Sequence, residues 1–265
     1  MDPNTHSAKS EITLLEELID DAGLMSNQAP IIELYNHLKN TVFSDLRPDM
    51  IRLTSSSGSS VVLLLNDVSH PFVYQYYRCR ETYQNIILMQ DRIKNNVSRS
   101  LTQTFVDGTN TVVRRKIQYD VTDHLTMMTD HFPTLQTIVW ERIKPLHELP
   151  TNTIKPQINQ LIWDLVKALY GLHACGYSHG DSRYDNIGLK NGKFVLFDYN
   201  LSKWYGNDEH DFELLSRSLE FNLEFSMKLD SFAACRSFLK TLPAVLCLSP
   251  DELLDQFERN DVQLN

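Results

Sequence analysis

The spacing of hydrophobic residues predicts helices first and strands after them. Residues 10–21 have helical spacing, with Ser10 as the N-cap, and residues 30–40 form a second helical pattern that Pro30 opens. Three short runs rich in β-branched and aromatic residues follow, separated by polar turns. They predict a meander of strands over residues 50–54, 61–66 and 72–77.

The middle of the chain combines a segment of helical spacing with segments typical of strands. Residues 81–96 have helical spacing, and residues 101–106 and 111–118 flank the pair Asp107-Gly108, which is typical of a hairpin turn. Residues 137–143, with the sequence TIVWERI, form another strand candidate. This part therefore predicts one helix, one hairpin and one further strand.

The second half is mainly helical. A long apolar helix is expected from Pro156 to a stop at Gly176, and two short strands over 186–190 and 193–198 flank Asn191-Gly192. From about Glu209 onward the pattern is helical again. We predict an α+β fold of two lobes with a cleft between them. The expected parts are an N-terminal helical extension (1–45), a β-rich N-lobe (46–143) and a mainly helical, shortened C-lobe (144–265).

Composition narrows the class of protein. Of the 265 residues 42% are hydrophobic, which is enough for a real core, and the net charge of −9 argues against nucleic acid or an anionic membrane as the main partner. No apolar stretch approaches the ~18 residues of a membrane span, and the polar start of the chain lacks a signal-peptide centre. The four cysteines are far apart, which favours a reducing compartment. We expect a cytoplasmic protein, in its own or a host's cytosol.

One stretch carries candidate chemistry. A loop after the long helix contains His179, Gly180 and Asp181, Asn186 follows five residues after Asp181, and Asp198 ends the second short strand. Two carboxylates and an amide suit Mg²⁺, which takes few protein ligands and completes its shell with water and phosphate oxygens. Asp181 would stand apart and accept a proton from a substrate hydroxyl. The alternative is that these residues only cap turns and a helix.

These residues give the chain a resemblance to the protein-kinase-like superfamily. Its catalytic loop is H-x-D-x-x-x-x-N, which the sequence HGDSRYDN matches from His179 to Asn186. The resemblance implies that Asp181 is the catalytic base, that Asn186 and Asp198 (in FDYN) bind magnesium, and that ATP and Mg²⁺ are the cofactors. Arg183 lies where many Ser/Thr kinases carry a lysine that contacts the transferring phosphate.

The resemblance also implies a nucleotide site in the first lobe. The Ser/Gly run over residues 55–60 lies where the family has its glycine-rich loop, and its backbone N–H groups and hydroxyls can cradle phosphate, although a plain hairpin tip is the alternative. The strand 137–143 resembles the one that enters the hinge, with Trp140 at the gatekeeper position and backbone groups offered to adenine. The residues expected to bind nucleotide are Ser57, Gly58, Ser59, Gln75, Glu141 and Ile143.

Several positions depart from the family pattern. Gln75 replaces the lysine that grips the phosphates, and the nearest acidic candidate on the following helix is Asp91. Lys116 is either a substitute from another strand or an ordinary surface lysine. No A-P-E follows Asp198, so the compact end resembles that of aminoglycoside phosphotransferases, which also favour HGD. Asp211 either braces the catalytic loop or is a carboxylate favoured by a helix N-terminus.

Three functions follow from this pattern. The first is an ATP- and Mg²⁺-dependent phosphotransferase of divergent kinase fold, acting on Ser/Thr hydroxyls of a protein substrate. The second is a small-molecule kinase of the aminoglycoside type. The third is a pseudokinase that binds nucleotide, or a partner protein, without catalysis. The scattered histidines, which are expected to be structural or solvated, include His70, His131, His147 and His173.

Overall fold

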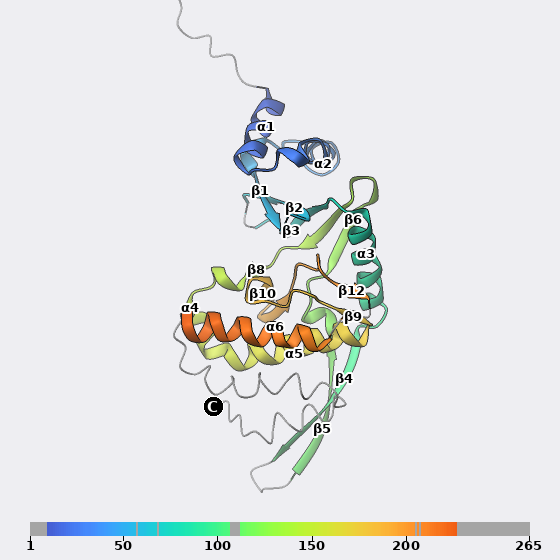
Figure 1. The fold of residues 1–265 in the computed structure, drawn as a ribbon, viewed down its shortest axis with the longest axis vertical. Helices are drawn as coiled ribbons and strands as arrows, with labels where there is room; N and C mark the ends of the chain where they lie inside the picture. The colour runs from blue at the N-terminus through green and yellow to red at the C-terminus, as the bar shows by residue number, and fades with distance from the viewer. Residues whose placement is uncertain are drawn as a thin grey trace, which may run out of the picture. The chain divides into compact units, whose positions relative to one another are not determined.

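The chain forms an α+β structure of two compact units. The computed structural model describes residues 10–226, except 57, 68, 107–111, 205 and 207. The first unit comprises Met1–Gln84 and Met128–Arg142, and the second comprises Asn85–Met127 and Ile143–Asn265. Figure 1 labels the helices and strands of both units. Among the described residues, no helix is long and apolar enough to cross a membrane.

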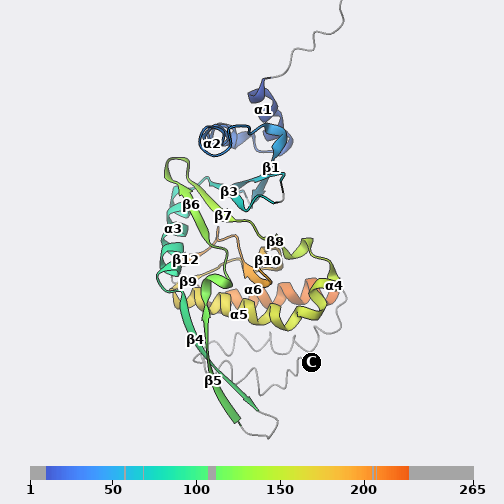
Figure 2. The same ribbon diagram turned by 180° about the vertical axis from the view of Figure 1, so that it is seen from behind.

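A five-stranded antiparallel sheet forms the centre of the first unit. Its order is β1-β2-β3-β7-β6. The strands are β1 (Ile51–Ser56), β2 (Ser60–Leu65), β3 (Phe72–Tyr77), β6 (Met128–Phe132) and β7 (Thr137–Glu141). The predicted meander and the strand at 137–143 are confirmed, the latter ending at Glu141. The sequence pattern missed β6, an edge strand beside β7 (Figure 2), because only its first residue is buried.

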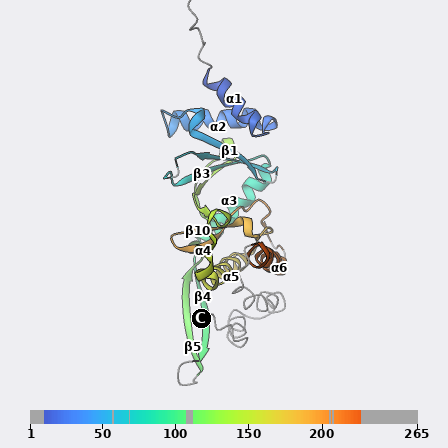
Figure 3. The same cartoon turned by 90° about the vertical axis from the view of Figure 1, so that its left-hand side faces the viewer.

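Two helices cover one face of this sheet (Figure 3). They are α1 (Glu11–Asp21) and α2 (Gln28–Thr41), and the predicted N-cap is confirmed, since the Ser10 hydroxyl accepts a hydrogen bond from the Thr13 N–H. Side chains from both helices and from the strands form one buried cluster, which includes Leu15, Ile19, Leu34, Tyr35, Leu38, Leu53, Leu63, Tyr74 and Val139. The N-terminal helices therefore complete the core of the first unit.

Helices and short sheets make up the second unit. Its helices are α3 (Arg80–Lys94, which begins in the first unit), α4 (Thr151–Ile154), α5 (Ile158–Ala174) and α6 (Asp208–Leu219), and a π-helix, η8 (Glu220–Ser226), follows. Its strands are β4 (Ser98–Val106), β5 (Val112–Asp120), β8 (Lys144–Pro145), β9 (Tyr177–Ser178), β10 (Ile187–Lys190), β11 (Lys193–Leu196) and β12 (Lys203–Trp204). The predicted hairpins β4–β5 and β10–β11 are both present.

The long apolar helix α5 supports the strands of this unit. Its buried residues recur at helical spacing and include Ile162, Leu165, Leu169 and Leu172, as the pattern predicted. Asp164, also on α5, accepts the backbone N–H of Phe194 in β11 at 2.9 Å. The helical pattern expected from Glu209 onward is confirmed up to Ser226, and its remainder lies outside the described residues.

A short segment before β6 supports the end of β11. The Leu196 N–H donates to the carbonyl of His124 at 3.1 Å, and the Thr126 N–H donates to the carbonyl of Leu196 at 3.0 Å. The His124 side chain is buried, with its Nδ1 3.4 Å from a carboxylate oxygen of Asp164. Burial, assisted by the positive charge of Lys167, lowers the pKa of His124 to about 4. His124 is therefore neutral in the folded protein at neutral pH.

This histidine makes stability depend on pH. In the unfolded chain it gains a proton below about pH 6.5, whereas in the fold its pKa is about 4. The unfolded state therefore binds more protons across this window, and the free energy of unfolding should fall as pH drops from about 6.5 to about 4. We expect His124→Gln to reduce the difference between urea midpoints at pH 7.5 and pH 5. A variant at the exposed His147, His147→Gln, should keep it, and equal differences in the two variants would refute this assignment.

Candidate active site

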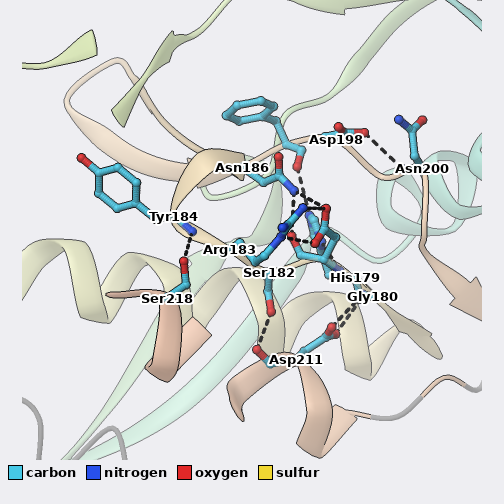
Figure 4. A network of polar contacts seen from close by, with 12 residues as sticks. His179, Gly180, Ser182, Arg183, Tyr184, Asn186, Asp198, Asn200, Asp211 and Ser218 are labelled. Carbon is cyan, nitrogen blue, oxygen red and sulfur yellow. Dashed lines mark hydrogen bonds and ion pairs between the residues drawn. The ribbon is translucent and has the colours of Figure 1, made fainter. Parts of the chain in front are cut away.

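A buried carboxylate holds the loop that contains Asp181. Asp211, in the first turn of α6, accepts the backbone N–H of His179 at 2.6 Å and that of Gly180 at 2.7 Å. Its carboxylate also lies 2.9 Å from Nε2 of His173, and its backbone carbonyl accepts the hydroxyl of Ser182. Figure 4 shows Asp211 on one side of the loop, with Asn186 and Asp198 on the other. The structure therefore supports the bracing interpretation of Asp211.

These contacts determine the charge of Asp211, which is fully buried. Burial is the largest influence on its pKa and acts to raise it. The hydrogen bond from His173, the electrostatic interaction with the His179 and His173 rings, and the backbone N–H of His179 together outweigh burial and lower the pKa below its usual value. An ionised carboxylate with three hydrogen-bond donors is therefore part of the core of this unit.

Gly180 has no room for a side chain. Its φ is 78°, and a Cβ atom would lie 2.3 Å from the backbone oxygen of Leu201. Backbone oxygen cannot move aside as a flexible side chain can, and the left-handed conformation itself favours glycine. The close passage of the chain at Leu201 explains why glycine stands between His179 and Asp181.

His179 connects this loop to the residue before Asp198. Its side chain is fully buried, with Nε2 3.1 Å from the Phe197 carbonyl and Nδ1 3.3 Å from the backbone N–H of Asp181. Since that N–H can only donate, Nδ1 accepts, and the ring proton is on Nε2 and donates to Phe197. Burial lowers the pKa of His179, in agreement with a neutral ring. The hydrogen bond to Phe197 brings the loop and the Asp198 turn together.

Asp181, Arg183 and Asn186 form one polar group. The Asn186 side-chain amide donates to the backbone carbonyl of Asp181 at 2.8 Å and to its Oδ2 at 2.9 Å. Arg183 donates through Nη2 to Oδ2 at 2.9 Å, and its Nε lies 2.5 Å from Oδ1. The hydrogen bond to Asp181 raises the pKa of Arg183 above its usual value. The Asp181 side chain is 16% exposed, so its carboxylate has a fixed orientation and still reaches solvent.

Two residues of the predicted site lie outside the strands expected to hold them. Asn186 ends a 3₁₀ turn, Tyr184–Asn186, and β10 begins one residue later. Asp198 lies two residues beyond the end of β11 with a φ of 63°, and the Asn200 N–H lies 3.4 Å from its carboxylate. The strand predicted over 193–198 ends early because the carbonyl of Phe197 bonds to His179 rather than to a neighbouring strand. Aspartate is among the few residues that tolerate this left-handed conformation.

The expected phosphate-binding residues of the first unit have other contacts. The Gln75 side chain is buried in β3, where its amide donates to the Ser60 hydroxyl at 2.8 Å and its carbonyl accepts the Tyr77 hydroxyl at 2.8 Å. Gly58 is exposed at the β1–β2 hairpin tip with a φ of 74°, and the carbonyl of Ser59 accepts the Arg78 N–H. Ser57 lies outside the described residues, so a predicted phosphate cradle there remains a prediction.

The residues expected at the hinge are divided between the units. Glu141 pairs with Phe72 across the sheet of the first unit, and the Arg142 N–H donates to the carbonyl of Pro71 at 2.7 Å. Ile143 belongs to the second unit, where its side chain packs over Gly188, because a Cβ there would lie 2.5 Å from Ile143 Cδ1. Their role toward adenine stays a prediction. Asp91 is exposed on α3, and the side chain of Lys116 lies outside the described residues.

Sequence reasoning missed several residues that shape the site. His173, expected to be structural or solvated, bonds to Asp211 across 38 positions of sequence. The Ser202 hydroxyl donates to the His179 carbonyl at 3.0 Å, and the Tyr199 ring lies 5.3 Å from the His179 ring between centroids. Spacing along the chain carries no signal for such distant pairs. A histidine in the last turn of the helix ahead of the loop was the only hint available.

The donor chemistry fits a magnesium ion with few protein ligands. Because Nδ2 of Asn186 is committed to Asp181, its amide oxygen is the atom that can serve as a ligand, and Asp198 adds a partly exposed carboxylate. Both are hard oxygen donors. In the part of the chain that the structure describes, no group of three or more His, Cys, Asp or Glu residues could hold a metal. The described residues of this loop therefore provide a site with few protein ligands rather than a cluster of three or more such side chains.

No family model matches the chain, and no curated protein matches it at a significant level. The residues and contacts of the chain itself therefore carry the functional conclusion.

Proposed function

We propose that this protein is an ATP- and Mg²⁺-dependent phosphotransferase of divergent protein-kinase-like fold that acts on Ser/Thr hydroxyls of a protein substrate. One observation carries the proposal. Asp181 and Asn186 share hydrogen bonds within the loop, and His179 of the same loop bonds to the residue before Asp198. A potential base and one potential metal ligand are thereby held in one polar group, and the second potential ligand, Asp198, follows the residue that His179 holds, as the motif implies.

The chemistry requires a base, a cation and a metal site. Asp181 would accept the proton of the substrate hydroxyl. The oxygen of that hydroxyl would form a bond to the transferred phosphorus as the bond from phosphorus to the nucleoside diphosphate breaks. Asn186 and Asp198 would hold Mg²⁺, which supplies charge neutralisation at the phosphates. Arg183 pairs with Asp181 and has a side chain 51% exposed, so its guanidinium can turn toward a phosphate oxygen.

The order of elements along the chain also supports this proposal. The first unit holds an antiparallel sheet whose third strand is followed by helix α3, and the second contains α5 directly before the loop. In protein kinases the phosphate-gripping lysine lies on the third strand, and its glutamate partner lies on the helix that follows. The corresponding strand here carries Gln75.

Gln75 favours a second candidate, a pseudokinase that binds nucleotide without transferring phosphate. Its amide is buried and hydrogen-bonded to Ser60 and Tyr77 inside the sheet, and it carries no charge for the phosphates. A neutral residue at this point removes one of the interactions that orient ATP for transfer. Binding and transfer therefore have to be measured separately.

Thermal unfolding with ATP, with and without Mg²⁺, tests the proposal. A ligand that binds only the folded state raises its stability, by about 2.7 kcal/mol at a hundredfold excess over Kd. We expect an Mg²⁺-dependent increase that Asp198→Asn abolishes. Asp185→Asn, at an exposed carboxylate in the loop that contains Asp181, is the control and should retain the increase.

The outcomes separate the candidates. An Mg²⁺-dependent increase together with transfer to protein supports the phosphotransferase. The same increase without transfer supports the pseudokinase. No increase with ATP in either condition contradicts the proposed nucleotide site.

A further inference from the structure

The hydroxyl of Tyr199 reaches back across the turn that contains Asp198. Tyr199 is buried, and its hydroxyl lies 3.0 Å from the carbonyl of Leu196 and 3.2 Å from that of Thr126. Leu196 is the last residue of β11. The tyrosine side chain therefore closes a short loop that begins at the strand end, passes through Asp198 and returns to the strand.

The carbonyls that accept this hydroxyl are themselves fixed. The Leu196 carbonyl also accepts the backbone N–H of Thr126, and the Thr126 carbonyl lies 3.4 Å from the buried side-chain amide of Gln90 on α3. Leu125 and Leu196 form a parallel bridge between the two segments. The Tyr199 hydroxyl thus bonds to a strand end that the Thr126 N–H and the Leu125 bridge also hold in place.

The backbone around Asp198 needs such support. A φ of 63° costs free energy for any residue with a Cβ atom, even where aspartate lowers that cost. Phe197 is held through its carbonyl by His179, and the carbonyl of Tyr199 accepts the Ser202 N–H at 3.0 Å. The hydroxyl of Tyr199 adds a side-chain contact that spans the turn, from Tyr199 back to the carbonyl of Leu196.

We propose that Tyr199 is a positioning residue whose hydroxyl holds the Asp198 turn in its left-handed conformation, so that the carboxylate is presented to a divalent cation before the cation binds. This inference rests on the proposed function, because it gives Asp198 the role of a metal ligand. A phenylalanine fills the same space and keeps the ring beside His179, but it leaves the two carbonyls without this donor. The turn would then have to be ordered when the metal binds, which weakens metal binding.

The test compares Tyr199→Phe with Tyr35→Phe. Tyr35 is a matched control because it is equally buried and donates its hydroxyl to a backbone carbonyl, that of Leu46, at 2.9 Å in the first unit. The readout is the Mg²⁺ concentration that gives half of the ATP-dependent thermal stabilisation. We expect a rise of roughly fivefold in Tyr199→Phe, from the loss of one buried hydrogen bond, and no change in Tyr35→Phe. An equal Mg²⁺ requirement in both variants overturns the inference.

A second readout needs no ligand. Hydrogen exchange of the Asn200 and Ser202 amides, both bonded within the turn, should be faster in Tyr199→Phe than in the wild type or in Tyr35→Phe. Unchanged exchange at both amides overturns the inference.

If the wild type shows no Mg²⁺-dependent stabilisation, the proposed function and the cation role fail together, and exchange then reports on the turn alone. If the wild type is stabilised and only the Tyr199 effects are missing, the proposed function stands and the inference is wrong.

Discussion

Replacing Asp181 by asparagine should lower the rate of phosphate transfer by about 10²–10⁴-fold, the usual contribution of a positioned general base. Asparagine has a similar shape and still accepts the hydrogen bond from Asn186, but its amide cannot take the proton of an attacking hydroxyl. Nucleotide affinity should change little, because Asp181 is not expected to contact the metal. The measurement is transfer of labelled phosphate from ATP to a serine- and threonine-containing protein substrate.

The control for this variant lies in the same loop. Asp185→Asn changes the net charge by the same amount at an exposed carboxylate, and it should keep most of the activity. Full activity in Asp181→Asn would remove Asp181 as the base. Loss of ATP-dependent stabilisation in Asp181→Asn would show instead that the change disturbs binding.

Replacing Asp211 by asparagine should destabilise the second unit by about 3–5 kcal/mol, the range seen when a buried charged contact loses one partner. The carboxylate accepts the N–H groups of His179 and Gly180 and contacts His173. An amide in its place has a single acceptor atom, and its nitrogen would face one of these donors. Urea unfolding followed by circular dichroism measures the loss.

Glu213→Gln is the matched control for this change. Glu213 lies on the same helix, and its ion pair with Arg217 is exposed, so its loss should cost less than about 1 kcal/mol. Equal unfolding free energies in Asp211→Asn and Glu213→Gln would contradict the bracing role of Asp211.

Local patterns predicted most of the fold. The N-cap at Ser10, the hairpin signals at Asp107-Gly108 and Asn191-Gly192, and the apolar face of α5 all act within a few residues, and each predicted element is present. Strand β6 was missed because it lies at the sheet edge with polar residues outward, so it lacks the alternation of a half-buried strand.

Prediction of the candidate site stopped where long-range contacts begin. The spacing between Asp181 and Asn186 is local, and the structure shows that the two residues share hydrogen bonds. The hydrogen bond from His173 to Asp211 spans 38 positions of sequence, and the one from Tyr199 to Thr126 spans 73. No rule about spacing along the chain predicts such contacts. The left-handed turn at Asp198 was missed for the same reason, because its anchors come from His179 and Thr126.

A crystal structure with Mg²⁺ and a non-hydrolysable ATP analogue tests the central claim most directly. We expect the amide oxygen of Asn186 and the carboxylate of Asp198 at about 2.1 Å from the metal, with the remaining positions filled by phosphate oxygens and water. A structure in which the nucleotide binds without these two side chains as ligands, or in which Mg²⁺ binds elsewhere on the chain, would contradict the account.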